Sequence, residues 1–539
     1  MKKIISLLST VVIAFMSLFI VSADTVSIPA NRPHFIGTFV QPWLYASWSA
    51  ERANQEFTHM KEIGIEYIIM GDTLTKTKSG TKFSYDVTYP TTIAEATSGY
   101  GGFDMVGMLL SYCKKYDIKC YLGMGNQTPW DFMDSRTGVL DFGNFAASVA
   151  TDLYNQYKSI YPDTFYGFYF TPELANFSGY NATTSRDAYV ANFSDCFNTV
   201  LDTINKLDPN MPMLYSPYVN VVSSNATFEN TMQFYTDLYK KTNFREIDIL
   251  CPQDSIGAGG QKLDTLEKWT KGYKDAIALS GKTSKLWANC EDFVQPTSTV
   301  AEDWTSCDTK RFIQQLAIAD KYCESIVTFA YPHYWSPYNV VSGFDRSYID
   351  YLTTGTVENT PPVEPTKVRY DVTGTKTATL EWTPATDAYD IARYNVYKYN
   401  PLTYKFQKIG SSVAKQRNGQ FQVPKISTTF DATNLSTKPV IIAIETMDCT
   451  GNFSKNIIVN LDLTKTNNGV NLSEVGGISG ITTTVDDLVA YAQVIKDGGT
   501  STKLSPETNP NTVSDSLVAV SVLSILSCGL IITLKKKKK

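Results

Sequence analysis

The sequence predicts an α/β fold, a (β/α)8 TIM barrel followed by a C-terminal β-sandwich. The chain has 539 residues with 43% hydrophobic content, which is enough for more than one domain. Between residues 34 and 355, eight strand-like runs alternate with helix-like stretches, which fits the length of one barrel with insertions. After residue 366, alternating apolar and polar runs separated by turn residues indicate a small antiparallel sandwich.

The expected barrel strands are short and apolar on both faces, as parallel strands buried in a barrel are. The clearest helix between them has an apolar stripe, spaced by three and four, from Phe193 to Ile204. A doubly wound open sheet is the weaker alternative, because no glycine-rich phosphate loop follows the first strand. The expected strands are Phe35–Trp43, Glu66–Asp72, Lys119–Gly125, Tyr166–Pro172, Met213–Tyr218, Asp248–Asp254, Lys285–Glu291 and Ser325–Tyr331.

Both ends of the chain indicate export and attachment. Residues 1–23 have the charged start, apolar run and small-residue end of a signal peptide, with cleavage expected after Ala23; an uncleaved anchor is the alternative. Residues 517–539 combine an apolar run long enough to span a membrane with a cytoplasmic lysine tail. The segment Asn509–Val513 resembles a Gram-positive sorting motif, with Val513 in place of the usual glycine.

We therefore expect an extracellular protein at the cell surface, attached to the membrane or the cell wall. Its net charge of −5 gives no indication of nucleic acid as a partner. The predicted organisation is a signal peptide at 1–23, the barrel at 30–357, a proline-rich linker at 358–365, the sandwich at 366–462, a polar spacer at 463–516, and the membrane-spanning run with its lysine tail at 517–539.

Two glutamates stand at the carboxyl ends of expected strands, where a (β/α)8 barrel has its active site. Glu173 follows the fourth strand and Glu291 ends the seventh. Glycoside hydrolysis needs a protonated acid and a carboxylate on either side of the scissile bond, about 5–5.5 Å apart in retaining enzymes. We interpret Glu173 as the acid/base and Glu291 as the nucleophile. Asp254 and Asp292 are the alternatives.

The other strand ends carry carboxylates, amides and aromatic rings, the groups that contact sugar hydroxyls and C–H faces. The chain has only three histidines and no Gly-x-Ser-x-Gly motif, so zinc and Ser-His-Asp chemistry are disfavoured, and we predict no metal or cofactor. The glycine-rich run 254–260 is interpreted as a loop over the site, with a phosphate cradle as the alternative. The predicted substrate-binding residues are Gln41, Trp43, Asp72, Trp130, Tyr218, Gln253, Asp254, Trp287, Asn289, Tyr331, His333 and Trp335.

Five short motifs, in the runs 37–43, 60–67, 169–173, 252–257 and 289–293, resemble the bacterial family called domain of unknown function 4434. The resemblance covers about residues 33 to 355, and it implies a glycoside-hydrolase-like barrel. The placement of the two glutamates is also similar to the large clan of retaining glycosidases, although Thr171-Pro172 precedes Glu173 where that clan has asparagine just before the acid. The motifs are Gly37–Trp43, Met60–Tyr67, Tyr169–Glu173, Pro252–Gly257 and Asn289–Phe293.

The predicted sandwich resembles a fibronectin type III domain. The resemblance rests on Leu380-x-Trp382, the run Tyr394–Tyr397 and the turn Asp448–Ser454. Together these features predict a surface-anchored glycoside hydrolase that cleaves an extracellular oligo- or polysaccharide. A non-catalytic carbohydrate-binding or adhesion protein on the same scaffold is the alternative.

Overall fold

The computed structural model describes most of the chain between residues 26 and 471. The expected signal peptide, sorting-like motif and C-terminal apolar run lie outside the described residues, and no helix within the described part is long and apolar enough to cross a membrane. The described ranges are 26–93, 98–99, 103–174, 185–221, 227–295, 304–373, 377–383, 385, 390–400, 402–413, 416–417, 420–421, 425–429, 440–461 and 470–471.

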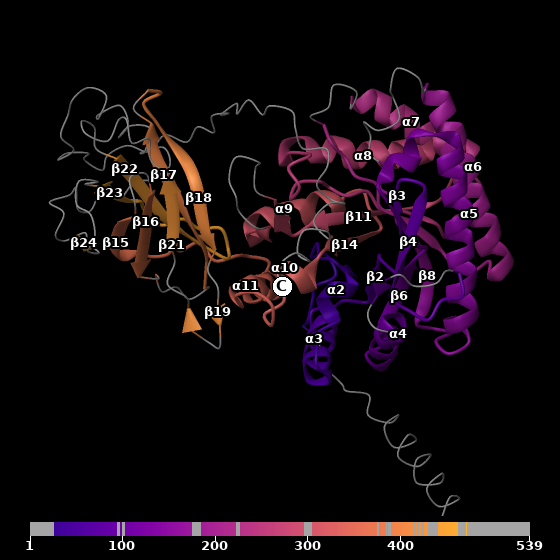
Figure 1. Ribbon diagram of the computed structural model, residues 1–539, viewed down its shortest axis with the longest axis horizontal. Helices are drawn as coiled ribbons and strands as arrows, with labels where there is room; N and C mark the ends of the chain where they lie inside the picture. Colours follow the sequence, from indigo (N-terminus) through magenta and orange to yellow (C-terminus); the bar gives the residue numbers. More distant parts are fainter. Residues whose placement is uncertain are drawn as a thin grey trace, which may run out of the picture. The chain divides into compact units, whose positions relative to one another are not determined.

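The described residues form two compact units (Figure 1). The first unit extends to Asp292 and includes Phe312–His333 and Leu352–Gly355. The second contains Phe293–Arg311, Tyr334–Tyr351 and the chain from Thr356 onward. The barrel strands all belong to the first unit, and the two C-terminal sheets belong to the second.

Eight parallel strands close into a barrel, which confirms the predicted fold class. The ring closes because β1 pairs with both β2 and β14. Each strand lies within or beside its predicted range, and most are shorter, because their ends leave the sheet early. The strands, in order around the ring, are β1 (Gly37–Val40), β2 (Tyr67–Met70), β6 (Lys119–Gly123), β8 (Phe165–Phe170), β9 (Met213–Tyr215), β10 (Ile249–Leu250), β11 (Lys285–Glu291) and β14 (Ser325–Phe329).

Aromatic and aliphatic side chains fill the interior of the barrel. Because side chains alternate between the two faces of a strand, this interior set fixes which later residues point inward. Trp287 on β11 points inward, so Asn289 and Glu291 share its face. After β10, Cys251 points inward, and Gln253 lies two residues further along on the same side. The buried interior cluster is Phe39, Ile69, Tyr121, Tyr169, Leu214, Ile249, Cys251, Trp287, Val327 and Ala330.

Helices surround the barrel and place their carboxyl ends where the next strand begins (Figure 1). Ser, Thr or Asp side chains cap six of them by accepting the N–H three residues later, which satisfies one of the free donors there. The main helices are α3 (Ala50–Glu62), α4 (Met105–Lys115), α5 (Arg136–Leu153), α6 (Arg186–Leu207), α7 (Phe228–Lys241), α8 (Leu263–Ser280), α9 (Thr309–Asp320) and α11 (Gly343–Thr354). Shorter ones are α2 (Pro42–Tyr45), α10 (Tyr331–Tyr334), the 3₁₀ helix Trp130–Asp134 and the π-helical turn Tyr154–Lys158.

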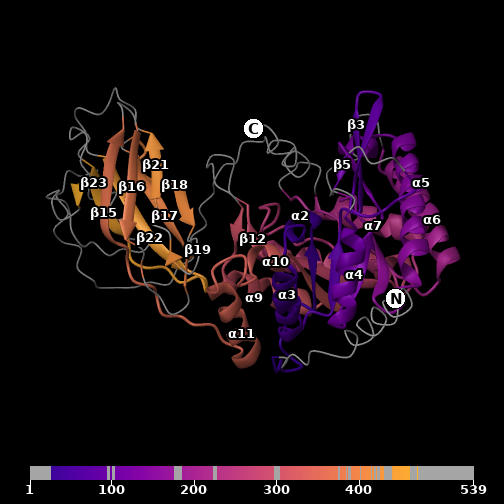
Figure 2. The same cartoon turned by 60° about the horizontal axis from the view of Figure 1, so that its bottom comes forward.

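A small extra sheet follows the second and third barrel strands, and the sequence did not predict it. Strands β3 (Leu74–Ser79) and β4 (Lys82–Val87) form a hairpin that also pairs with β7 (Asn126–Thr128) and β5 (Ser98–Gly99). Figure 2 shows this hairpin projecting from the end of the barrel at which α2 lies. That end carries the carboxyl termini of the barrel strands.

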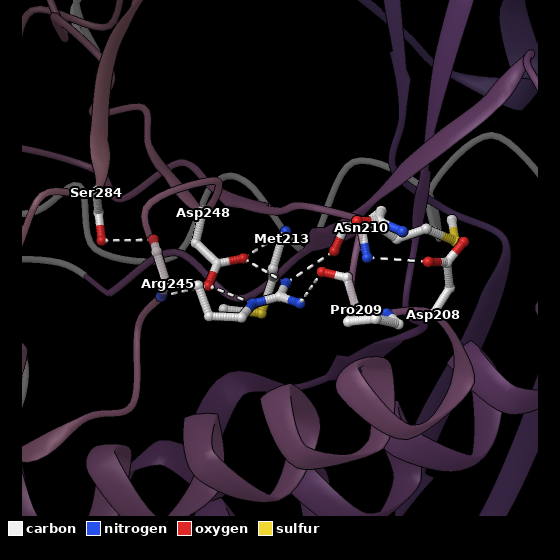
Figure 3. A network of polar contacts seen from close by, with 8 residues as sticks. Asp208, Pro209, Asn210, Met213, Arg245, Asp248 and Ser284 are labelled. Carbon is white, nitrogen blue, oxygen red and sulfur yellow. Dashed lines mark hydrogen bonds and ion pairs between the residues drawn. The ribbon is translucent and has the colours of Figure 1, made fainter.

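The opposite, amino-terminal end is held by a network around Arg245 and Asp248 (Figure 3). Asp248 directly precedes β10, and its carboxylate accepts the Met213 N–H at the start of β9 at 2.9 Å. The Arg245 guanidinium donates to the same carboxylate from Nε at 3.0 Å and from Nη2 at 2.6 Å. Ser284, just before β11, donates to the Arg245 carbonyl oxygen at 2.9 Å. The network therefore ties together the starts of three neighbouring strands.

Two four-stranded antiparallel sheets make up most of the second unit, so the predicted C-terminal β-sheet region is present. Trp382 and Tyr394 meet edge to face across the two sheets, with ring centroids 5.4 Å apart. One sheet contains β21 (Lys425–Thr429), β16 (Thr377–Thr383), β15 (Thr366–Thr373) and β24 (Val470–Asn471); the other contains β18 (Lys405–Val413), β17 (Ile391–Asn400), β22 (Val440–Asp448) and β23 (Ile457–Leu461). The fibronectin type III resemblance remains a prediction.

A turn of the second unit also contacts the start of α9. The N–H groups of Thr309 and Lys310 donate to the carbonyl oxygens of Cys449 and Thr450, at 3.1 and 3.0 Å. Free N–H groups at a helix start need acceptors, and here the turn after β22 supplies two. Two short ladders complete this unit, β12 (Phe293–Val294) with β13 (Thr305–Ser306), and β19 (Gln416–Arg417) with β20 (Gln420–Phe421).

Candidate active site

The two predicted catalytic glutamates both lie at the carboxyl end of the barrel. Glu173 comes three residues after the end of β8, the fourth strand of the ring, and Glu291 is the last residue of β11, the seventh. Between them stand β9 and β10, whose following residues include Ser216 and Gln253. The count of strands from the sequence therefore agrees with the ring.

Glu173 lies in a poorly solvated position beside neutral groups. Burial raises its pKa to about 7, and a hydrogen bond with the Gln253 side chain opposes this only partly. The hydroxyl of Tyr169, which points into the barrel, lies close enough for Glu173 to raise its pKa as well. A carboxyl group with a pKa near 7 is still partly protonated at neutral pH, which is what a general acid requires.

Glu291 is held from three sides and is only 2% exposed. Its carboxylate oxygen Oε2 accepts the Ala258 N–H at 2.7 Å. Its own N–H donates to Asp254 at 3.2 Å, and its carbonyl oxygen accepts from Gln315 at 3.1 Å. A backbone N–H aimed at the carboxylate stabilises its ionised form, which suits a nucleophile.

Asp254, the alternative to the two glutamates, accepts hydrogen bonds from groups that position Glu291. Its Oδ1 accepts the N–H groups of Ile256 and Glu291, and its Oδ2 accepts from Gln315 Nε2 at 2.6 Å. It also lies against the thiol of Cys290, which alternates with the inward residues of β11. Asp254 therefore lies behind β11 and not among the inward-facing groups, which corrects its prediction as a substrate contact. Asp292 is fully buried, and its N–H donates to Phe329.

The glycine-rich run after β10 forms an ordered loop. Ser255 has a positive φ of 54°, and its hydroxyl accepts the Val219 N–H at 3.1 Å. Val221 donates to the Gly260 carbonyl oxygen at 2.9 Å, and a Cβ at Gly260 would clash with the Tyr218 hydroxyl. Because the loop directs its Ala258 N–H at the Glu291 carboxylate, it does not form a cradle for a second anion.

Asp72 is hydrogen-bonded to the extra sheet. Asn126 Nδ2 donates to Asp72 Oδ1 at 3.3 Å, and Trp130 Nε1 donates to Asn126 Oδ1 at 3.4 Å. Burial, and to a lesser extent the charge of Asp86, raise the pKa of Asp72. Asp72 in turn contributes to the raised pKa of Tyr169. Asp72, Asn126 and Trp130 thus form one hydrogen-bonded polar group, which we call the β7 wall.

Gln41, Trp43 and His333 form a second group, at the ends of β1 and β14. Trp43 is 54% exposed, and its indole N–H donates to Gln41 Oε1 at 2.7 Å. The rings of Trp43 and His333 meet edge to face at 4.9 Å. Burial lowers the pKa of His333 to about 3, so this imidazole is neutral at physiological pH.

Three aromatic rings in the predicted substrate-binding set are core side chains. Trp287 packs inside the barrel against Tyr67, with centroids 5.3 Å apart. Tyr331 is fully buried against Phe35, and Trp335 is fully buried within the second unit. Their large rings are needed to fill space, which strand-end position alone did not reveal. Asn289 is also buried, and it donates to Ser216 Oγ at 3.1 Å.

Sequence reasoning missed Gln315, Asn126 and Tyr169. Gln315 is a fully buried amide on α9 between the apolar residues Phe312 and Leu316, and a polar residue inside such a stripe is a signal that was available. Tyr169 lies within an expected strand, and its position gave no sign of a role beside Glu173. No group of residues suited to a metal ion occurs in the described part of the chain. Cys113 and Cys120 form no disulfide.

The fold and the site define a (β/α)8 barrel with paired glutamates after its fourth and seventh strands. The chain belongs to the family described as domain of unknown function (DUF4434), whose model matches residues 35–340. No curated protein matches the sequence.

Solved structures similar to this chain include an intracellular xylanase from Thermoanaerobacterium saccharolyticum, at 11% identity and a TM-score of 0.36, covering 57% of this chain and 88% of the xylanase. A chitinase from Bacillus thuringiensis is similar at 10% identity and a TM-score of 0.37, covering 80% and 85%. An endo-1,4-β-mannanase from Rhizomucor miehei reaches 14% and 0.37, covering 57% and 89%. At this level of similarity they say nothing about the activity of this chain.

Proposed function

We propose that this protein is a retaining glycoside hydrolase that acts on a glycan outside the cell. The observation that carries the proposal is the contrast between its two strand-end glutamates. Glu173 has a pKa raised to about 7, and Glu291 accepts a backbone N–H on its carboxylate. A carboxyl group that keeps a proton, together with a carboxylate stabilised by a hydrogen-bond donor, is the pair that retaining hydrolysis uses.

In this mechanism Glu173 protonates the glycosidic oxygen while Glu291 attacks the anomeric carbon. The bond to the leaving group breaks and a glycosyl ester with Glu291 forms. Glu173, now ionised, removes a proton from water, which attacks the anomeric carbon and releases Glu291 as a carboxylate. Gln253 and Tyr169 lie beside the Glu173 carboxyl group and orient it through both steps.

Export and surface attachment are part of the proposal. Its support is the signal-like run at 1–23 and the apolar, lysine-ended run at 517–539. The degenerate motif Asn509–Val513 leaves two modes of attachment, a membrane anchor and a sortase-linked wall anchor. Fractionation of cells with and without sortase distinguishes them.

The test is hydrolysis of a glycan panel by the purified protein, beside Glu173→Gln and Glu291→Gln. We expect cleavage by the wild type with retained anomeric configuration, followed by NMR of the first product formed. Both variants should lose turnover while keeping the wild-type circular dichroism. Inverted product would exclude the nucleophile role of Glu291. Glycan binding with no turnover would favour the alternative, a non-catalytic carbohydrate-binding surface protein.

A further inference from the structure

Most segments that follow the barrel strands lack basic residues. At the start of α9, Arg311 donates to the Phe293 carbonyl oxygen at 2.7 Å. Asp72, Glu173 and Glu291 stand at the strand ends among neutral side chains, and the nearby His333 has a pKa of about 3 and is uncharged. Six segments that follow barrel strands contain no lysine or arginine at all. These segments are 41–49, 124–135, 171–185, 216–227, 251–261 and 330–333.

The segment after β2 is the exception, and its lysines lie away from Asp72. Lys76 sits over the ring of Phe83 at 4.1 Å and near Phe145 of α5 at 5.5 Å. Lys78, two residues further along the same strand face, pairs with Asp131 at 3.7 Å. Lys82 lies at the tip of the hairpin, next to its turn.

The other face of the same hairpin carries hydroxyls and a carboxylate. Thr75 pairs across the strands with Asp86 and Asn126, so all three share a face. That face looks toward the site, because Asn126 binds Asp72 and Asp86 raises the pKa of Asp72. Lys76 and Lys78 alternate with these residues and so point the opposite way. Lys82 shares the face of Asp86, four residues away along β4 at the tip of the hairpin.

We propose that this site takes glycans without acidic groups, and that it rejects uronate, sulfated and phosphorylated ones. The inference rests on the proposed function and names the substrate class of that site. The sugar would contact the exposed Trp43 and the amide and carboxylate groups of the β7 wall.

Charge decides this selectivity because an anion that reaches Asp72, Glu173 and Glu291 meets carboxyl groups and neutral side chains, while Lys82 lies at the tip of the hairpin. Sugar carboxylates and sulfates are bound in proteins mainly by arginine and lysine. Here an anionic ring would lose its hydration next to several carboxylates, which weakens its binding by a factor of about ten or more. A neutral ring loses nothing of this kind, and its hydroxyls donate to the same carboxylates.

The test is binding of the full-length Glu291→Gln protein to two panels of oligosaccharides. The neutral panel contains cello-, xylo-, manno- and N-acetylchito-oligosaccharides, and the acidic panel contains oligogalacturonate, oligoalginate, hyaluronan and heparin fragments. We expect binding within the neutral panel and at least about tenfold weaker binding of every acidic glycan at low salt. Stronger binding of an acidic glycan, or no binding to either panel, would overturn the inference.

A charge-reversal variant tests whether the negative charges beside Asp72 weaken the binding of acidic glycans. Asp86→Lys places a cation beside Asp72, and it should raise the affinity for acidic fragments about tenfold, with a dependence on salt. Asp131→Lys is the matched control, since it makes the same change in net charge next to Lys78, on the other face of the hairpin. Equal effects of the two variants would show that overall charge, and not this wall, selects the ligand.

The two proposals fail in different ways. Neutral glycans bound by Glu291→Gln but never cleaved by the wild type would overturn hydrolysis and support the substrate class. Acidic glycans cleaved by the wild type but not by Glu291→Gln would support hydrolysis and overturn the substrate class.

Discussion

At the amino-terminal end of the barrel the buried carboxylate of Asp248 is surrounded by donors, including the Arg245 guanidinium at 2.6 Å. At the carboxyl end Glu173 has an amide and a phenol for neighbours, and burial raises its pKa to about 7. Both carboxyl groups are removed from water, but only one has a cation beside it. In this barrel, the carboxylate that is paired with a cation stabilises the strands, and the carboxyl group without a neighbouring cation is the one whose pKa is raised.

The same contrast extends to the helices. Four of those that run back to the amino-terminal end, α3, α4, α6 and α7, have lysines in their last turn, which favour the negative pole of a helix. These lysines are Lys61, Lys115, Lys206 and Lys241. The loops at the carboxyl end are nearly free of basic residues. Five experiments test this difference between the two ends of the barrel, and the one with the largest expected effect comes first.

Glu291→Gln should lower the catalytic rate by about 10³-fold or more, because glutamine cannot form the glycosyl intermediate. Steady-state rates on the best neutral substrate measure the loss. The control is Glu324→Gln at the amino-terminal end, whose backbone N–H makes the bond to Leu286 and is unaffected by the change. Equal loss in both variants would mean that the site lies elsewhere.

Asp248→Ala should destabilise the barrel by about 3–5 kcal/mol, since it leaves Arg245 buried without its carboxylate. Thermal unfolding measures the loss, and the activity of the remaining folded protein should stay near that of the wild type. Asp248→Asn keeps an acceptor for the Met213 N–H and should cost less. If activity per folded molecule fell as far as stability, the two ends would not be separable.

Glu173→Gln should stabilise the protein at alkaline pH. The pKa of Glu173 rises from 4.5 in the free state to about 7 on folding. The favourable contribution of its bound proton is therefore complete below pH 4.5 and is lost as the pH rises through 7, by about 2–3 kcal/mol. The variant lacks this loss, so its melting temperature relative to the wild type should increase between pH 4.5 and 8. A constant difference would contradict a raised pKa.

Gln315→Ala should lower kcat by about ten- to a hundredfold with little change in KM, because Gln315 positions Glu291 without reaching the sugar. Gln315→Glu, which keeps the size but loses the amide donor next to Asp254, is expected to be no better. A change in KM alone would assign Gln315 to binding instead of positioning.

Trp43→Ala should raise KM about tenfold and leave folding unchanged, because the ring is 54% exposed and serves as a contact for sugar C–H faces. Leu279→Ala on α8 is the matched control, since that side chain is 71% exposed. If Trp43→Ala melted much earlier than the control, the ring would be a structural element.

The sequence predicted the eight barrel strands because each is a short apolar run. That pattern can be recognised without knowing which residues pack against it. It also placed Glu173 and Glu291 after the correct strands. It did not predict the β3–β4 hairpin, whose first strand alternates threonine with lysine and resembles a polar loop. Nor could it assign Asp254, because the direction of that side chain depends on where β10 leaves the sheet.

The exposure of aromatic rings at the strand ends was also not predictable from the sequence. Trp43 and Trp335 both follow barrel strands and are the same residue type, yet one is exposed and the other is enclosed. Only the packing of Phe344 and Tyr348 around Trp335 separates them. Such contacts join residues distant in sequence, so no local pattern reports them.

The two hydrogen bonds from the start of α9 to the turn at Cys449 and Thr450 limit how this chain can be shortened or recombined. A protein truncated after residue 357 would leave Thr309 and Lys310 without those acceptors. The C-terminal sheets are therefore not an interchangeable module, and gene fusions that replace them should retain the turn or supply a new cap for the helix.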